Sequence, residues 1–171
     1  MGPALCAYTW DTYPGRWFFE ENGKGPLRKG VREKLVILST ARSMRIWDSL
    51  YDAHSTHPAL LPGGFFSRHI RQPVNWEDYW REDEAAFISI LQKLLPIAPE
   101  TEVFFFWSRV DCIATDWEGF TLFWDAFLYD DEFPLLYIPE LSGKDRFDVQ
   151  FGPHGELSMP PLPPGYQIVR K

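Results

Sequence analysis

Residues 102–108 read Glu-Val-Phe-Phe-Phe-Trp-Ser, and this stretch decides the fold. Its five consecutive apolar side chains, from Val103 to Trp107, leave neither face of a strand polar enough to meet water. We therefore predict a strand at the centre of a sheet that is covered on both faces. The chain then passes through Arg109-Val-Asp111 to Ile113–Trp117, which we predict to be the neighbouring strand.

Further strands are predicted on both sides of this pair. Leu35–Leu38 is either a short strand or a buried lead-in to the next helix, and Pro134–Ile138 has the composition of a strand. Residues 147–151 and 156–159 flank Gly152-Pro-His-Gly155, which is typical of a hairpin with a four-residue loop.

Helices are predicted where apolar side chains recur at intervals of three and four residues. Ser, Thr and Asn are favoured N-cap residues, because their side chains accept hydrogen bonds from the first turn. The segments are residues 41–54 after the N-cap candidates Ser39 and Thr40, residues 76–80 and 83–95 after the N-cap candidate Asn75, and residues 121–128.

Helices followed by a meander of strands indicate an α+β fold. We expect an antiparallel sheet of about five to six strands packed by two to three helices. The chain divides into an irregular aromatic-rich N-terminal segment at residues 1–30, a single α+β domain at 31–159, and a proline-rich tail at 160–171. Proline cannot donate to a ladder, so the tail is expected to be extended rather than part of the sheet.

The composition excludes several classes of protein. The 171 residues include 8 Trp, 7 Tyr and 14 Phe, enough apolar surface for a core without a metal or disulfide framework. Cys6 and Cys112 lie far apart and lack the spacing of a zinc site. The first residues lack the charged and apolar regions of an export signal, and no apolar run approaches the roughly 20 residues of a membrane span. We expect a cytoplasmic protein that does not contact membranes.

Charge is distributed unevenly. The net charge is −7, residues 1–45 carry +4, and residues 72–140 carry −12, from three basic residues and fifteen carboxylates. Such an acidic region argues against binding to nucleic acid, which requires cations for the phosphates. It favours a cationic partner, whose association the field would accelerate. A solvated acidic face is the alternative interpretation.

The candidate catalytic groups are incomplete. His54 and His57 have a spacing that could place two metal ligands on one helix face, but a third ligand is missing nearby, and His54 suits a helix C-terminus. Asp111, Asp116 and Glu118 form the best carboxylate group, with the last two on one face of the predicted strand. They lack a basic clamp for a phosphate.

Other sequence signals for catalysis are weak. The run Asp130-Asp131-Glu132 lacks the alternating ligands of a calcium loop, and Cys112 lies between apolar residues that predict burial. The chain contains no Walker loop, GxGxxG turn, GxSxG elbow or HExxH helix. We predict that it is not an enzyme and that it has no catalytic residue, metal site or cofactor.

A pattern of aromatic and turn residues runs through the chain: Leu38–Arg42, Trp47, His57, Pro58, Trp117, Gly119, Trp124, Phe127, Asp130, Asp131, Pro134, Leu135, Phe151 and Gly155. Through this pattern, from about Trp17 to Met159, the sequence resembles a small bacterial family known only as a domain of unknown function. The layout of that family is in turn similar to immunity proteins of bacterial toxin systems, especially the SUKH type, which are acidic, aromatic-rich, cytoplasmic and without catalytic motifs. That resemblance implies a protein that binds and blocks a cognate toxin domain.

The leading hypothesis is a non-enzymatic acidic binding protein, an immunity protein that occludes the active site of a basic toxin or effector domain. The alternatives are a small metal-dependent hydrolase using His54, His57 and nearby carboxylates, and a small-ligand-binding domain. Whether Trp76 and Trp80 face the partner or the core stays open, because large aromatics are usually buried. The candidates for partner binding are Trp76, Glu77, Asp78, Tyr79, Trp80 and Asp83 in one patch, and Asp116, Glu118, Asp130 and Asp131 in a second.

Overall fold

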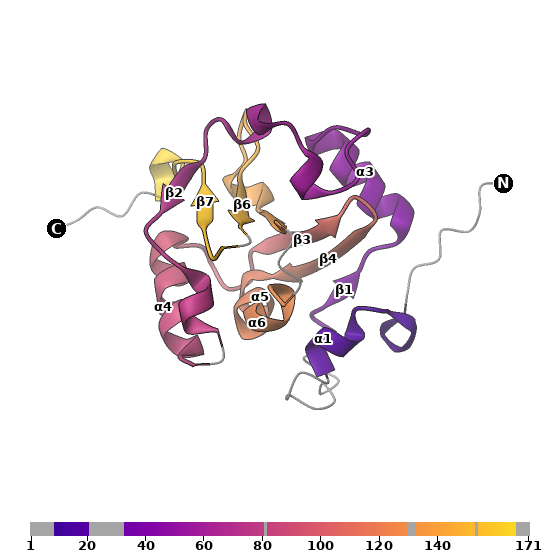
Figure 1. Ribbon diagram of the computed structural model, residues 1–171, viewed down its shortest axis with the longest axis horizontal. Coiled ribbons are helices and arrows are strands. Elements are labelled where there is room, and N and C mark those ends of the chain that lie inside the picture. The colour runs from indigo at the N-terminus through magenta and orange to yellow at the C-terminus, as the bar shows by residue number, and fades with distance from the viewer. Residues whose placement is uncertain (1–8, 21–32, 81, 130–132, 153, 167–171) are drawn as a thin grey trace.

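The computed structural model describes residues 9–20, 33–80, 82–129, 133–152 and 154–166, with only the backbone of Trp17 and Phe18 (Figure 1). The strands are β1 Val36–Ile37, β2 Ile70–Gln72, β3 Glu102–Ser108, β4 Asp111–Asp116, β5 Leu135–Tyr137, β6 Asp148–Phe151 and β7 Leu157–Met159. The α-helices are α1 Arg16–Glu20, α3 Thr40–Leu50, α4 Glu84–Leu94, α5 Trp117–Leu122 and α6 Trp124–Phe127. The 3-10 turns are η1 Trp10–Thr12, η2 Pro58–Leu60, η3 Gly63–Phe66, η4 Trp76–Tyr79, η5 Pro139–Leu141 and η6 Pro164–Tyr166.

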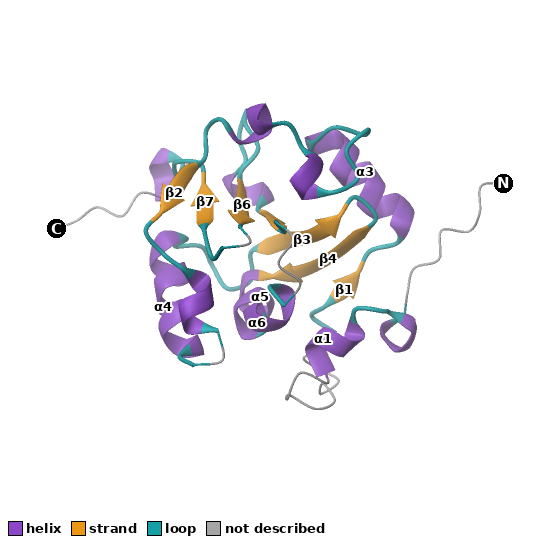
Figure 2. Cartoon of the chain, in the orientation of Figure 1, coloured by secondary structure: helices purple, strands orange, loops and turns teal. Residues whose placement is uncertain are grey.

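The described strands form one antiparallel sheet in the order β1-β4-β3-β5-β6-β7-β2 (Figure 2). Strand β3 pairs with β4 on one side and β5 on the other, so that Phe105 lies opposite both Ile113 and Leu136. The predicted α+β class and the central position of β3 are confirmed. The sheet has seven described strands, more than the five to six predicted, because residues 70–72 pair with β7 and add a strand at the edge.

Both faces of the sheet are covered, which explains why β3 is apolar on both faces. Val103 and Phe105 belong to a first core, which includes the α4 residue Phe87 and the aromatic residues of α5 and α6. Phe104 and Phe106 belong to a second core, which includes Trp47 of α3. Figure 1 shows α3 on one side of β3 and β4, and α5 with α6 on the other.

Helix α3 is shorter than the 41–54 predicted. It begins after Ser39, whose hydroxyl accepts a hydrogen bond from the N–H of Arg42 at 3.2 Å, and it ends at Leu50. Tyr51 has an extended backbone, with φ −131° and ψ −168°. This backbone places its ring in the second core and lets its hydroxyl donate to a buried carboxylate. The helical spacing of apolar residues therefore does not continue beyond Tyr51.

The other predicted helices are also interrupted. Residues 76–79 form only the 3-10 turn η4. Helix α4 begins separately at Glu84, after the N-cap residue Asp83, whose side chain accepts a hydrogen bond from the N–H of Ala86 at 3.1 Å. The predicted helix at 121–128 is two shorter helices, because the chain turns at Phe123 between α5 and α6. Helices α3 and α4 have eleven residues each, and in the described ranges no helix has the length and apolar character needed to cross a membrane.

The terminal segments contribute to the first core. In the N-terminal segment, expected to be irregular, residues 16–20 form α1, and Phe19 is fully buried against α6 through a ring contact with Phe127 at 5.0 Å between centroids. In the proline-rich tail, Leu162 and Tyr166 pack against the same core. Both segments therefore add apolar contacts beyond residues 31–159.

The predicted hairpin joins β6 to β7 and depends on Gly155. This residue has φ +82°, and a side chain there would collide with Asn75, which precedes η4. We expect Gly155→Ala to lower the free energy of unfolding by at least about 1–2 kcal/mol, because the left-handed backbone disfavours any side chain. Urea denaturation measures the change.

Gly143→Ala is the matched control, since a methyl group there enters open space. Its effect should stay within about 0.5 kcal/mol. Equal losses of stability in the two variants would show that neither the left-handed backbone at Gly155 nor the closeness of Asn75 excludes a side chain there.

Candidate functional site

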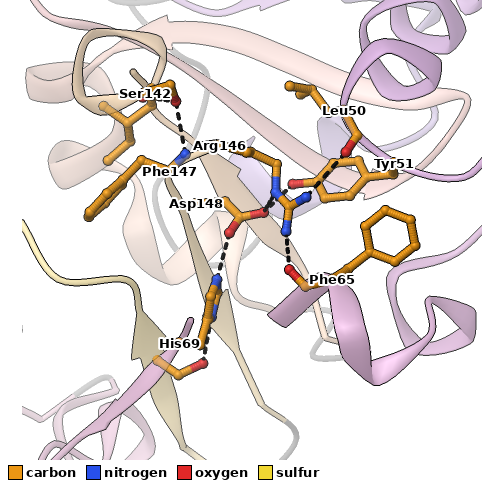
Figure 3. Close-up of polar contacts among 10 residues, drawn as sticks. Leu50, Tyr51, Phe65, His69, Ser142, Arg146, Phe147 and Asp148 are labelled. Carbon is orange, nitrogen blue, oxygen red and sulfur yellow. Dashed lines mark hydrogen bonds and ion pairs between the residues drawn. The ribbon is translucent and has the colours of Figure 1, made fainter. Parts of the chain in front are cut away.

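A buried polar cluster surrounds Asp148 of β6 (Figure 3). Asp148 is 0% exposed, and it points away from the first core because side chains alternate along the strand after Phe147. Its Oδ1 accepts a hydrogen bond from Nε2 of His69 at 2.6 Å, and its Oδ2 accepts one from Nε of Arg146 at 2.7 Å. The hydroxyl of Tyr51 donates a third bond, to Oδ2.

The remaining polar atoms of the cluster also form hydrogen bonds. Arg146 donates from Nη1 to the carbonyl of Leu50 at 3.2 Å and from Nη2 to the carbonyl of Phe65. Its guanidinium carbon lies 4.5 Å from the centroid of the Tyr51 ring, a cation–π distance. On the other side, Nδ1 of His69 lies 3.0 Å from the hydroxyl of Ser158. In the neutral tautomer that donates from Nε2, this nitrogen accepts from Ser158.

The order Ser158, His69, Asp148 has the connectivity of a nucleophile, a base and an orienting carboxylate. The charge of Asp148, however, is balanced by Arg146 rather than reserved for the imidazole. The His69 side chain is only 5% exposed. The arrangement is a polar junction that ties the end of α3, the start of β2, β6 and β7 together, and its members His69 and Arg146 also line a hollow of about 210 Å³.

Burial sets the protonation of two further groups. Burial, with the neighbouring Asp148 carboxylate, raises the pKa of the Tyr51 hydroxyl well above its usual value. Burial likewise raises the pKa of the Cys112 thiol well above its usual value. Cys112 therefore stays a neutral core residue, as its apolar neighbours predicted, and is not activated as a nucleophile.

The first predicted patch is exposed along one edge. Glu77, Asp78 and Asp83 are exposed, and Tyr79 and Trp80 are half-buried. We call these five residues the acidic patch. Among the described residues, no salt bridge neutralises the three carboxylates. The sixth predicted residue of this patch, Trp76, is only 3% exposed and belongs to the first core.

A hollow of about 360 Å³ lies beside the acidic patch. The rings of Trp80 and Tyr129 meet across it, with centroids 5.7 Å apart and planes tilted by 57°. Nε1 of Trp80 donates to the carbonyl of Asp125 in α6 at 3.2 Å, which fixes the orientation of the indole. The hollow is lined by Trp76, Glu77, Trp80, Leu128 and Tyr129.

The second predicted patch is neutralised in part. Glu118 forms an ion pair with Lys34, and Asp116 lies 3.7 Å from the same ammonium group. The prediction that Asp116 and Glu118 share a strand face is wrong, because Glu118 lies in α5 and Asp116 caps that helix by accepting from the N–H of Gly119 at 2.7 Å. Asp130 and Asp131, together with Glu132, lie outside the described residues.

The two histidines of the hydrolase hypothesis are not on a helix. His54 is exposed beyond the end of α3, so it does not cap that helix at its C-terminus, and Nδ1 of His57 accepts from the N–H of Ala59 at 3.1 Å at the start of η2. In the described ranges, no group of three or more His, Cys, Asp or Glu side chains is placed to hold a metal ion. Hydrolase activity through His54 and His57 stays a prediction without geometric support.

The sequence analysis did not identify the Asp148 cluster. The available signal was the alternation in 147–151, where Asp148 shares a face with Gln150 between three apolar residues. In a sheet covered on both faces, a carboxylate on that face has to be buried. Its partners Tyr51 and His69 are 97 and 79 residues away along the chain, and no local sequence pattern predicts contacts over such separations.

The fold and these sites define an antiparallel α+β protein with a polar junction around a buried carboxylate and an exposed acidic patch beside an aromatic hollow. The chain belongs to the family described as a protein of unknown function (DUF2947), whose model matches residues 8–159. The expected resemblance to a family of unknown function is thus confirmed. No curated protein and no solved structure matches the chain. These comparisons give no link to SUKH immunity proteins.

The junction is expected to be sensitive to the loss of one partner. Arg146→Met removes the cation beside a fully buried carboxylate, and we expect it to lower the free energy of unfolding by about 3–5 kcal/mol. Arg68→Met is the control, because Arg68 pairs with Asp145 at the exposed surface and should cost less than about 1 kcal/mol. Chemical denaturation compares them, and equal losses would contradict the role assigned to Arg146.

The raised pKa of Tyr51 makes stability fall at high pH. The unfolded chain loses the phenolic proton above about pH 10, whereas the folded protein keeps it, so unfolding becomes easier by up to about 1.4 kcal/mol per pH unit. Below about pH 10 the contribution of Tyr51 to the free energy of unfolding does not change with pH. Tyr51→Phe should reduce the slope of stability against pH above about pH 10.

The Cys112 thiol is present in both proteins, so the difference in slope belongs to Tyr51. Denaturation midpoints from pH 8 to pH 11 measure it. Parallel curves for wild type and Tyr51→Phe would disprove the proposed coupling.

Proposed function

We propose that this protein binds a basic protein partner through the acidic patch and performs no catalysis itself. The supporting observation is that Glu77, Asp78 and Asp83 are exposed next to half-buried aromatic side chains, with no described salt bridge to neutralise them. Carboxylates steer a cationic surface into contact, and aromatic residues are enriched among the residues that carry binding energy.

The surrounding charge strengthens this proposal. Residues 72–140 carry a net charge of −12, so the patch lies in the most acidic part of the chain. A field of this sign raises the local concentration of a cationic partner and accelerates its association. The second patch is a weaker candidate, because Lys34 already compensates Asp116 and Glu118.

A narrower proposal concerns the identity of the partner. The similarity between the layout of this family and that of SUKH-type immunity proteins suggests a cognate toxin or effector domain, bound in the cytoplasm and blocked by occlusion of its active site. A toxin domain that acts on nucleic acid has a cationic site, to which an acidic surface is complementary. The narrower proposal predicts that the captured partner loses its activity in the complex.

The proposal is tested with a triple variant, Glu77→Gln, Asp78→Asn and Asp83→Asn, used beside the wild type to capture partners from cells that carry the gene. Asparagine at position 83 keeps an N-cap oxygen for α4. Mass spectrometry should identify one stoichiometric basic protein that wild type retains at low salt and releases at high salt. The triple variant should bind it about tenfold or more weakly.

A double variant, Glu100→Gln and Glu102→Gln, serves as the control because it neutralises exposed carboxylates outside the acidic patch. It should bind the partner with nearly wild-type affinity. Unchanged affinity in the triple variant would contradict the assignment of the patch. The absence of any basic partner at either salt concentration would contradict the function.

A further inference from the structure

We propose that two adjoining hollows around Arg146 form a binding site for an oxyanion, the carboxylate or phosphate group of a small organic molecule. The hollows have volumes of about 210 and about 260 Å³, and both are lined by Arg68, Asp145, Arg146 and Pro160. They lie between η3, the loop before β6 and the segment after β7. None of their lining residues belongs to the acidic patch, so this site is separate from the proposed partner surface.

Arg146 keeps hydrogen-bond donors that the polar junction does not use. A guanidinium group carries five N–H donors, and three are used by its bonds to Asp148, Leu50 and Phe65 (Figure 3). No bond to a described residue uses the other two, and Arg146 lines both hollows. Since 15% of its side chain is exposed, the guanidinium can donate these two N–H groups to a ligand in the hollows.

The charge of the lining favours an anion. Arg68, Lys144 and Arg146 are cationic, whereas Asp145 is the one carboxylate among the residues that line the two hollows. All of them lie outside residues 72–140, where the acidic charge of the chain is concentrated. Arginine suits carboxylate and phosphate oxygens in particular, because its planar N–H groups can donate two parallel hydrogen bonds to them.

Asp145 pairs with the second arginine of the site. Nη1 of Arg68 lies 3.0 Å from Oδ2 of Asp145, and more than half of each side chain is exposed. An ion pair this exposed contributes little to stability, so a carboxylate or phosphate of a ligand can replace Asp145 on the guanidinium of Arg68. Removing the charge of Asp145 should therefore improve the site for an anion.

Arg146 is held in place before a ligand binds. Its guanidinium carbon lies 4.5, 5.7 and 5.8 Å from the ring centroids of Tyr51, Phe65 and Phe66. This packing and the three hydrogen bonds fix the orientation of the group, which lowers the entropy cost of binding. Leucine and proline side chains line the larger hollow and provide apolar surface for the organic part of the ligand.

The experiment titrates the whole protein with benzoate, with its neutral isostere benzamide, and with phenyl phosphate, in a buffer without carboxylate or phosphate. The backbone amide signals of Ser67, Arg68 and Lys144 in a ¹⁵N-correlation spectrum are the readout, because these residues line the hollows. We expect saturable shifts in the millimolar range with the two anions and at least about threefold weaker binding of benzamide. Tighter binding of benzoate supports the site with a carboxylate as its ligand group, and tighter binding of phenyl phosphate supports it with a phosphate.

Three variants establish where the anions bind. Asp145→Asn should tighten benzoate binding by about two- to fivefold, because it removes the carboxylate that competes for Arg68. Arg68→Met should weaken benzoate binding by about the same factor. Both side chains are exposed, so both variants should keep the fold. Arg45→Met is the matched control, because it removes an exposed arginine of α3 that lines neither hollow, and it should leave the affinity unchanged.

Several results would contradict the site. The absence of saturable shifts with both anions, or equal binding of benzoate and benzamide, would overturn it. Equal losses of affinity in Arg68→Met and Arg45→Met would show that the anions respond only to the net charge of the protein, which would overturn the location. An unchanged affinity in Asp145→Asn would overturn the competition between Asp145 and the ligand. These outcomes do not depend on the capture of a basic partner, since the hollows and the acidic patch share no residue.

Discussion

The burial of one carboxylate constrains much of the structure. Asp148 is fully enclosed, and an isolated charge in that position would cost several kcal/mol. The chain can bury it only by bringing Tyr51, His69 and Arg146 to the same point. The cluster therefore closes the long connection from the end of α3 to the edge strand β2. The cluster also favours one path for residues 51–69, because any other path removes the hydrogen bonds of Tyr51 and His69 from the buried carboxylate.

The opposite face of the sheet depends on aromatic packing rather than on charge. Phe105 packs against Phe120 and Phe127, and Phe87 of α4 packs against Trp124 of α6 at 4.4 Å between centroids. These contacts fix α4, α5 and α6 as one layer. The turn η4 lies on that layer through Tyr79 and Trp80, so the position of the acidic patch is set by the first core. A flexible loop with the same charges would lack this support.

The sequence predicted those parts of the fold that depend on a local pattern of residues. The apolar run at 102–108 and the glycines at 152 and 155 placed β3 and the hairpin, since burial and turn geometry are local there. The edge strand at 70–72 was missed, because three residues, one apolar and two polar, are too few to show the alternation that marks a strand. Trp76 and Trp80 looked equivalent at a helical spacing. They are not, because Trp76 is 3% exposed inside the first core, whereas Trp80 follows the end of the 3-10 turn at Tyr79 and is half-buried at the border of that core.

The two sets of carboxylates in this protein differ in their dependence on salt. Ions in solution screen exposed charges over a Debye length of about 10 Å at 0.1 M, but they screen a pair enclosed by protein much less. Asp148 and Arg146 belong to the enclosed kind, while Glu77, Asp78 and Asp83 belong to the exposed kind. Salt can therefore weaken the attraction between the patch and a cationic partner while the junction that holds the fold stays intact. The proposed release of a partner at high salt therefore does not require the buried contacts of Asp148 to open.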